Sequence, residues 1–104
     1  MEVLIVNAKE NTIKKADINN SLETFYEIIG TDSVSIIARN INGKMTQIIC
    51  DEEGKLKADQ YVSAVSTEIN EFLVGNLIIK SQDKSIIDDF NKNGVITYSR
   101  YESI

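Results

Sequence analysis

The dipeptide Asn42-Gly43 is the feature that most limits the folds open to this chain. Both residue types accept positive φ, which the two central positions of a tight hairpin turn require. Residues 33–39 before it alternate between polar and apolar side chains, and residues 45–51 after it form a second β-branched run. The sequence therefore predicts an antiparallel hairpin built from these two segments.

Short apolar runs predict four further strands. The first is apolar throughout, which favours a central strand covered on both faces. The second carries Lys14 and Lys15, which mark an exposed edge. The third is interrupted at Gly75-Asn76, where we expect a bulge or a close approach of backbone. The four predicted ranges are residues 3–6, 12–18, 72–80 and 95–99.

Two helices have start and stop signals. The first is predicted from Asn20 as N-cap, with Glu23 at capping-box spacing, to Gly30 as a left-handed stop. The second is predicted to begin at Ser85 and to stop at Asn93-Gly94. Its buried face would contain Ile86, Ile87 and Phe90.

Residues 55–71 leave two interpretations open. Residues 58–69 could form a third helix, or residues 61–67 could form a short strand inside an irregular loop. With hairpins dominating the rest, we expect one α+β domain spanning residues 1–104. Its predicted architecture is a mixed, mainly antiparallel sheet with two or three helices packed on one face.

Composition limits the chemistry that the chain can perform. There is no histidine and one cysteine, which removes the common nucleophile pairs and histidine- or thiolate-based zinc sites. Phosphate-binding and dinucleotide-binding glycine motifs are absent too. We therefore predict a protein that is not an enzyme, with no catalytic residue, metal site or cofactor.

Charge and hydropathy predict the cellular location of the chain and the classes of partner that it does not bind. Acidic residues outnumber basic ones by 16 to 11, so general nucleic-acid binding is not expected. The apolar run near the N-terminus has no basic segment before it, and no stretch is long enough for a membrane span. We expect a cytoplasmic protein without membrane contact, in the host cytoplasm if a phage encodes it.

Several residues are candidates for a site, each with an ordinary structural alternative. Asp51-Glu52-Glu53 could form a hard-cation site, a pair of catalytic carboxylates or part of a partner contact, although a solvated turn is the commoner role. Cys50 could be a nucleophile, but the adjacent Asp51 would raise its pKa, and a buried thiol is more common. Tyrosines are favoured at protein contacts. The candidate partner-binding residues are Asp51, Glu52, Glu53, Tyr61, Tyr98 and Tyr101.

The chain resembles a known family at several segments. The opening run Met1-Glu2-Val3-Leu4-Ile5-Val6, the helix end Ile28-Ile29-Gly30, the run from Ile48 through Asp51-Glu52-Glu53-Gly54-Lys55-Leu56, and Leu73-Val74-Gly75-Asn76-Leu77-Ile78-Ile79 are similar to the domain of unknown function 3846 family. Asp51 departs from the family's asparagine, and residues 57–60 replace a proline-containing stretch. The resemblance implies a phage or mobile-element accessory protein and transfers no catalytic residue.

Three functional hypotheses follow. The first is an interaction protein that binds a host protein, such as an enzyme or an immune effector, in the manner of an anti-CRISPR or other anti-defence protein. The second is a binder that sequesters a nucleotide-like signal through Arg39 and Arg100, with a pocket between copies of a homo-oligomer. The third, which we favour least, is an enzyme that uses carboxylates and a metal.

Overall fold

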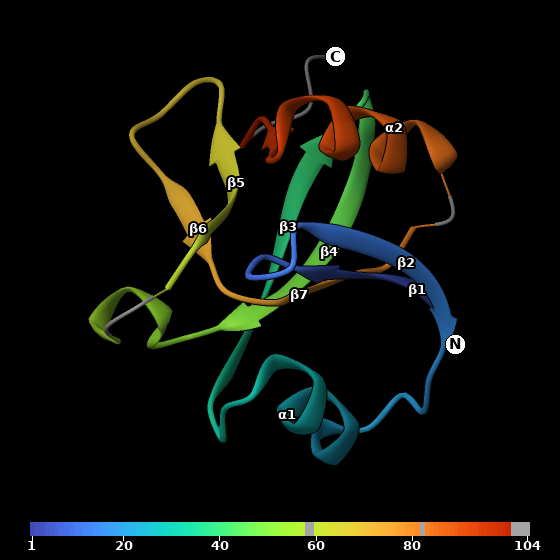
Figure 1. The fold of residues 1–104 in the computed structure, drawn as a ribbon, viewed down its shortest axis with the longest axis vertical. Coiled ribbons are helices and arrows are strands. Elements are labelled where there is room, and N and C mark those ends of the chain that lie inside the picture. Colours follow the sequence, from blue (N-terminus) through green and yellow to red (C-terminus); the bar gives the residue numbers. More distant parts are fainter. Residues whose placement is uncertain (58–59, 82, 101–104) are drawn as a thin grey trace.

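A computed structural model describes residues 1–57, 60–81 and 83–100 of the chain (Figure 1). Within these ranges the chain forms eight strands, two α-helices and one 3₁₀ turn. In chain order they are β1 (Glu2–Asn7), β2 (Thr12–Asp17), α1 (Leu22–Ile29), β3 (Val34–Ile41), β4 (Lys44–Asp51), η1 (Gly54–Leu56), β5 (Val62–Ser66), β6 (Phe72–Val74), β7 (Leu77–Ile79), α2 (Lys84–Asn93) and β8 (Ile96–Tyr98).

The strands form two sheets. The larger has the order β2-β1-β7-β4-β3, and all of its neighbours are antiparallel. The smaller has the order β6-β5-β8, in which β5 is antiparallel to β6 and parallel to β8. The predicted hairpin is confirmed, since β3 and β4 pair through Ile41 and Lys44, and Asn42 and Gly43 have φ of 54° and 81°. The α+β class and the mainly antiparallel pairing are confirmed too.

The prediction that the helices pack on one face of the sheet is wrong. Helix α1 buries Phe25 and Ile29 against Val3, Ile49 and Ile78 on one face of the larger sheet. Helix α2 and the smaller sheet pack on the opposite face, and Figure 1 shows the sheet between the two helices. Neighbouring residues of the central strands point to opposite faces, and both faces are apolar, so each needs a cover.

Both helices have side-chain caps at their first turn and left-handed residues after their last turn. The N-cap of α1 is Ser21 and not Asn20 as predicted, because the Ser21 hydroxyl accepts from the Thr24 N–H at 3.3 Å. Asp83 caps α2, which starts at Lys84, one residue before the predicted start. Gly30 and Gly94 have φ of 81° and 72°, as the predicted stops require.

Two predictions for the second half of the chain need correction. The alternative of a helix over residues 58–69 is wrong, because residues 62–66 form strand β5. Residues 58 and 59 lie outside the described ranges. The predicted bulge at Gly75-Asn76 is instead a crossing between sheets, with β6 before it in the smaller sheet and β7 after it in the larger.

The two sheets meet at one end of β3. Asn40 and Ser99 exchange backbone hydrogen bonds of 2.8 and 2.9 Å, which joins the segment after β8 to the edge of β3. A shared apolar core that includes Ile48, Leu73 and Phe90 fills the space between the larger sheet, the smaller sheet and α2. Toward the other end of β3 the two sheets separate. None of the helices in the described ranges is long and apolar enough to cross a membrane.

Candidate binding groove

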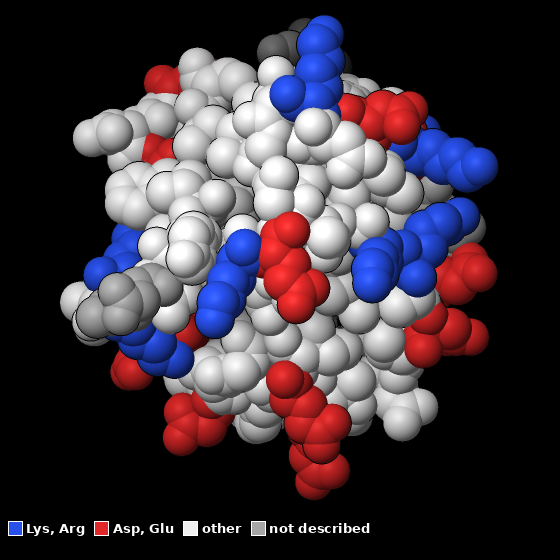
Figure 2. Space-filling model, in the orientation of Figure 1, with Lys and Arg blue, Asp and Glu red and all other residues white. Residues whose placement is uncertain are grey.

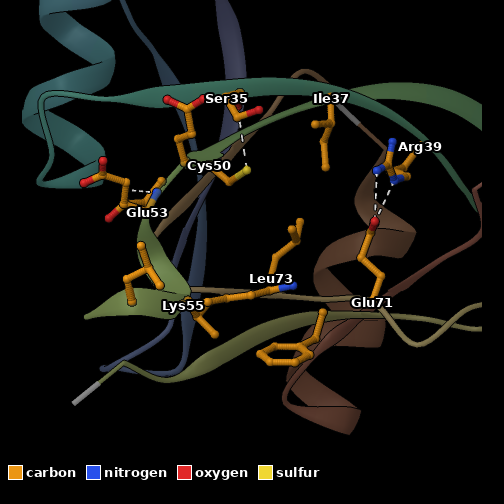
Figure 3. A pocket seen from close by; sticks show the side chains of 13 residues that line it. Ser35, Ile37, Arg39, Cys50, Glu53, Lys55, Glu71 and Leu73 are labelled. Atoms are coloured by element: carbon orange, nitrogen blue, oxygen red, sulfur yellow. Dashed lines mark hydrogen bonds and ion pairs between the residues drawn. The ribbon is translucent and has the colours of Figure 1, made fainter. Parts of the chain in front are cut away.

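A groove of about 230 Å³ lies where the two sheets separate (Figure 3). One wall is formed by β3 and β4, which contribute Ser35, Ile37 and Arg39 from the first strand and Cys50 from the second. These four side chains share one face of the sheet, because Ser35 is paired with Cys50 and successive residues of a strand alternate between faces. Strand β6, the residue before it and the segment after β4 form the remaining walls.

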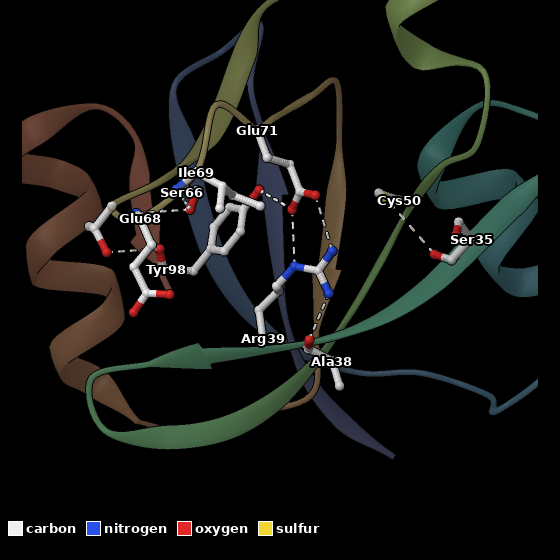
Figure 4. Close-up of polar contacts among 10 residues, drawn as sticks. Ser35, Ala38, Arg39, Cys50, Ser66, Glu68, Ile69, Glu71 and Tyr98 are labelled. Atoms are coloured by element: carbon white, nitrogen blue, oxygen red, sulfur yellow. Dashed lines mark hydrogen bonds and ion pairs between the residues drawn. The ribbon is translucent and has the colours of Figure 1, made fainter. Parts of the chain in front are cut away.

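An ion pair closes one end of this groove (Figure 4). Arg39 donates to both carboxylate oxygens of Glu71, from Nε at 3.0 Å and from Nη2 at 3.2 Å. Its Nη1 donates to the carbonyl oxygen of Ala38 at 2.8 Å. The Tyr98 hydroxyl donates to the same carboxylate at 2.7 Å. The pair therefore ties β3 to the start of β6 and to the end of β8.

The environment of this cluster keeps its groups in one protonation state. The Arg39 hydrogen bond lowers the pKa of Glu71, outweighing partial burial, and Tyr98 and Arg100 lower it further. The bond to Glu71 likewise raises the pKa of Arg39. Burial and the bond to Glu71 raise the pKa of Tyr98. At neutral pH the cluster is an ionised bidentate pair with a neutral phenol attached, which is a strong form of such a contact.

The other end of the groove is acidic. Asp51 accepts from Lys57 Nζ at 2.6 Å and from the Glu53 N–H at 2.9 Å. Burial alone would raise the pKa of Asp51, but these hydrogen bonds outweigh it and lower the pKa. Glu52 accepts from the Ser33 hydroxyl, whereas the Glu53 carboxylate meets no donor within the described part of the chain. Asp51 is therefore neutralised by Lys57, whereas Glu52 and Glu53 form no ion pair within the described residues.

Apolar side chains stand at the rim of the groove. Leu56, in η1, is 85% exposed, and Phe72, at the start of β6, is 40% exposed. The Lys55 ammonium lies 4.3 Å from the centre of the Phe72 ring, a cation–π contact that holds the ring at the surface. Gly54 packs closely at the base of this turn, since a Cβ there would lie 2.9 Å from Val74 Cγ2.

Cys50 lies in the wall of the groove as a buried thiol. Its Sγ is 3.7 Å from the carbonyl oxygen of Ser35. Burial, with a smaller contribution from Asp51, raises the pKa of Cys50 to about 11. The thiol is therefore protonated at neutral pH, which is the unreactive form.

Comparison with known proteins places the chain in a family. The domain of unknown function 3846 (DUF3846) matches over residues 1–93. The chain belongs to this family. No curated protein and no solved structure matches it. The groove of this DUF3846 member lies within the matched residues, because its lining extends from Ser35 to Val74.

The DUF3846 fold brings together some of the predicted site residues and separates others. Asp51, Glu52 and Glu53 line the groove together with Arg39. Tyr98 is 1% exposed and belongs to the core, so its predicted place on a contact surface is wrong. Its ring is buried because β8 is the strand of the smaller sheet that lies beside the edge of β3, next to the bridge from Asn40 to Ser99.

The remaining predicted site residues lie elsewhere. Tyr61 is exposed just before β5 but does not line the groove. Arg100 is exposed, and its charge adds a smaller lowering of the pKa of Glu71 to that of Arg39. Tyr101 lies outside the described residues.

Three residues of the groove were not anticipated from the sequence. Glu71 is 32 positions from Arg39, and no local pattern indicates that pairing. Leu56 had a weak signal as a large apolar residue in a polar stretch, whereas Phe72 begins an apolar run and was indistinguishable from a core strand residue. Across the described ranges, no group of three carboxylate or thiol side chains converges as metal ligands.

Proposed function

We propose that this DUF3846 member is a protein-binding domain of phage or mobile-element origin that acts by direct contact with a host protein. The host protein would be an enzyme or an immune effector, and the contact would block its active or recognition surface, as an anti-CRISPR or other anti-defence protein does. The groove between β3, β4, η1 and β6 is the contact site.

The exposed apolar rim of the groove carries this proposal. A leucine as exposed as Leu56 does not stabilise the free chain by burial. Burying such a side chain in a partner would contribute about 1.5–3 kcal/mol to the free energy of binding. Phe72 lies near it, and the groove supplies polar groups around both. An apolar centre with a polar surround is the usual anatomy of a protein contact site.

The groups in the groove support binding more than chemistry. The thiol of Cys50 is protonated, Asp51 is held by Lys57, and Glu71 is held by Arg39. Figure 2 shows acidic and basic side chains interspersed over one face, with acidic ones gathered at the end where α1 lies. That face has no continuous basic stripe of the kind that tracks a nucleic-acid backbone.

Sequestering a nucleotide-like signal is the second candidate, and the geometry supports it less. Three of the five N–H groups of Arg39 already bond to Glu71 and Ala38, so a phosphate would compete with the Glu71 carboxylate for the guanidinium. The groove volume, about 230 Å³, is also below the roughly 300–1,000 Å³ of small-molecule pockets.

Native mass spectrometry of the tagged chain, purified under mild conditions from a low-GC Gram-positive host, tests the proposal. We expect a stoichiometric protein partner on wild type that is lost from Leu56→Asp. Leu22→Asp is the matched control, because Leu22 is 54% exposed on α1 and does not line the groove. The control should keep the partner.

Two results would contradict the proposal. One is a partner that both variants retain, which would place the contact elsewhere. The other is a retained mass of a few hundred daltons that is lost on denaturation, which would favour the small-ligand function. The identified partner should also be inhibited by wild type and not by Leu56→Asp.

A further inference from the structure

Within the described residues, no strand pairs with the outer edge of β3 before Asn40, beside the groove. The turn pairs Ile41 with Lys44, and Glu52 donates its N–H to the Ser33 carbonyl, so odd-numbered residues of β3 bond to β4. Even-numbered residues therefore direct their N–H and C=O groups outward, as the bridge from Asn40 to Ser99 shows. The N–H groups of Ile36 and Ala38 have no acceptor within the described residues.

The opposite edge of the same sheet is protected. Strand β2 carries Lys14 and Lys15, both exposed, and charged side chains of this kind prevent a further strand from pairing. On β3, the residues before Asn40 whose backbone groups point outward are apolar: Val34, Ile36 and Ala38. The Ile36 side chain is 50% exposed. An unprotected apolar edge is unusual in a protein that remains monomeric unless another strand uses it.

The shape and charge of the groove indicate which kind of strand could bind there. A strand added to β3 would direct alternate side chains to the face of Ser35 and Ile37, over the groove. The groove volume, about 230 Å³, suits one or two apolar side chains better than a whole ligand. Next to the Val34 end of β3, Glu52 and Glu53 carry charges that a basic residue would complement.

We propose that β3 binds an extended segment of the partner protein by strand addition. The segment pairs with the outward backbone groups of Val34 and Ile36 and with the N–H of Ala38, whose carbonyl already accepts from Arg39. It inserts an apolar side chain into the groove and places a Lys or Arg beside Glu52 and Glu53. This inference rests on the proposed function and specifies the partner segment that it requires. A second copy of this chain is disfavoured as the occupant because the chain carries a net charge of −5.

A display library of eight-residue peptides tests this inference. Alternate positions are varied among Val, Ile, Leu, Phe and Thr, and the ends carry either Lys or Glu. Enriched peptides are synthesised, and their affinity is measured for wild type, Ile36→Pro and Lys15→Pro. Proline at residue 36 removes an outward N–H and leaves the bonds to β4 in place. Lys15→Pro is the matched control. Met1 and Ile18 exchange backbone hydrogen bonds, so even-numbered residues of β2 bond to β1 and the N–H of Lys15 points to the outer edge of β2.

We expect Lys-ended peptides with alternating apolar residues to be enriched on wild type. Ile36→Pro should weaken their binding by about tenfold or more, and Lys15→Pro should change it by less than about twofold. N-methylation of the peptide amides that face β3 should weaken binding to wild type equally, which keeps the test valid if a proline variant fails to fold.

Three results would overturn the inference. One is equal affinity of the peptides for wild type and Ile36→Pro, and another is an absence of enriched peptides. The third is a wild type that dimerises when Ile36→Pro does not, because the edge would then bind a second copy. If Leu56→Asp loses the host partner but Ile36→Pro still binds it, strand addition is contradicted and the proposed function is not.

Discussion

The contact between Arg39, Glu71 and Tyr98 is the residue-scale feature that holds the two sheets together beside the groove. Arg39 and Glu71 are 16% and 24% exposed at their side chains, so removing one partner leaves a mostly buried charge. We expect Arg39→Ala to lower the free energy of unfolding by about 1–3 kcal/mol. Lys44→Ala removes a lysine that is 73% exposed at its side chain and lies 3.9 Å from Asp83, so it should change the free energy of unfolding by under about 0.5 kcal/mol. Urea denaturation of both variants measures the difference, and equal losses would contradict a structural role for Arg39.

The same cluster predicts a dependence of stability on acid. The pKa of Glu71 is lowered in the native state, so its contribution is complete above the ordinary glutamate value of 4.5. It is lost as the pH falls through the lower native value. Glu71→Gln cannot titrate, so the stability difference between wild type and this variant should shrink as the pH is lowered from 6 to 2. A difference that stays constant across that range would show that the charge of Glu71 contributes nothing.

At the element scale, Gly75 determines how the chain crosses from β6 to β7. Its φ is +78°, and a Cβ there would lie 2.8 Å from Gln60 Oε1. The end of the exposed Gln60 side chain can move aside, whereas the positive φ cannot be relieved locally. We therefore expect Gly75→Ala to lower the free energy of unfolding by about 1–3 kcal/mol through backbone strain. Thermal or urea unfolding of Gly75→Ala, Gln60→Ala and the double variant tests this, because the two effects should be additive, and a double variant as stable as Gln60→Ala would contradict the strain.

Local signals were enough to predict most elements but not their arrangement. The turn at Asn42-Gly43 and the stops at Gly30 and Gly94 were predictable because one residue type fits each backbone conformation. The crossing at Gly75 was not, because a glycine inside an apolar run looks the same whether a strand bulges or changes sheet. The acidic end of the groove was visible in the sequence, whereas the pairing of Arg39 with Glu71 depends on contacts between distant segments.

At the scale of the whole molecule, one apolar core serves both sheets. The buried side chains around Phe90 come from α2, from the larger sheet and from the smaller sheet, and Phe90 itself is fully buried. A residue that fills such a shared core should affect every element at once. We therefore expect the two sheets to unfold together and not as separate units.

Phe90→Ala tests this cooperativity directly. Loss of the ring leaves a cavity between α2 and the sheets, and we expect the free energy of unfolding to fall by about 3–5 kcal/mol. Far-ultraviolet circular dichroism follows both sheets, and the near-ultraviolet tyrosine signal includes Tyr98 at the junction with β3. The two midpoints in urea should coincide in the variant as in wild type, because β8 cannot detach while the core that it shares with the larger sheet is intact. Loss of the tyrosine signal at a lower urea concentration than the far-ultraviolet signal would instead mean that the smaller sheet unfolds alone. The two sides of the groove would then be able to separate while the larger sheet stays folded.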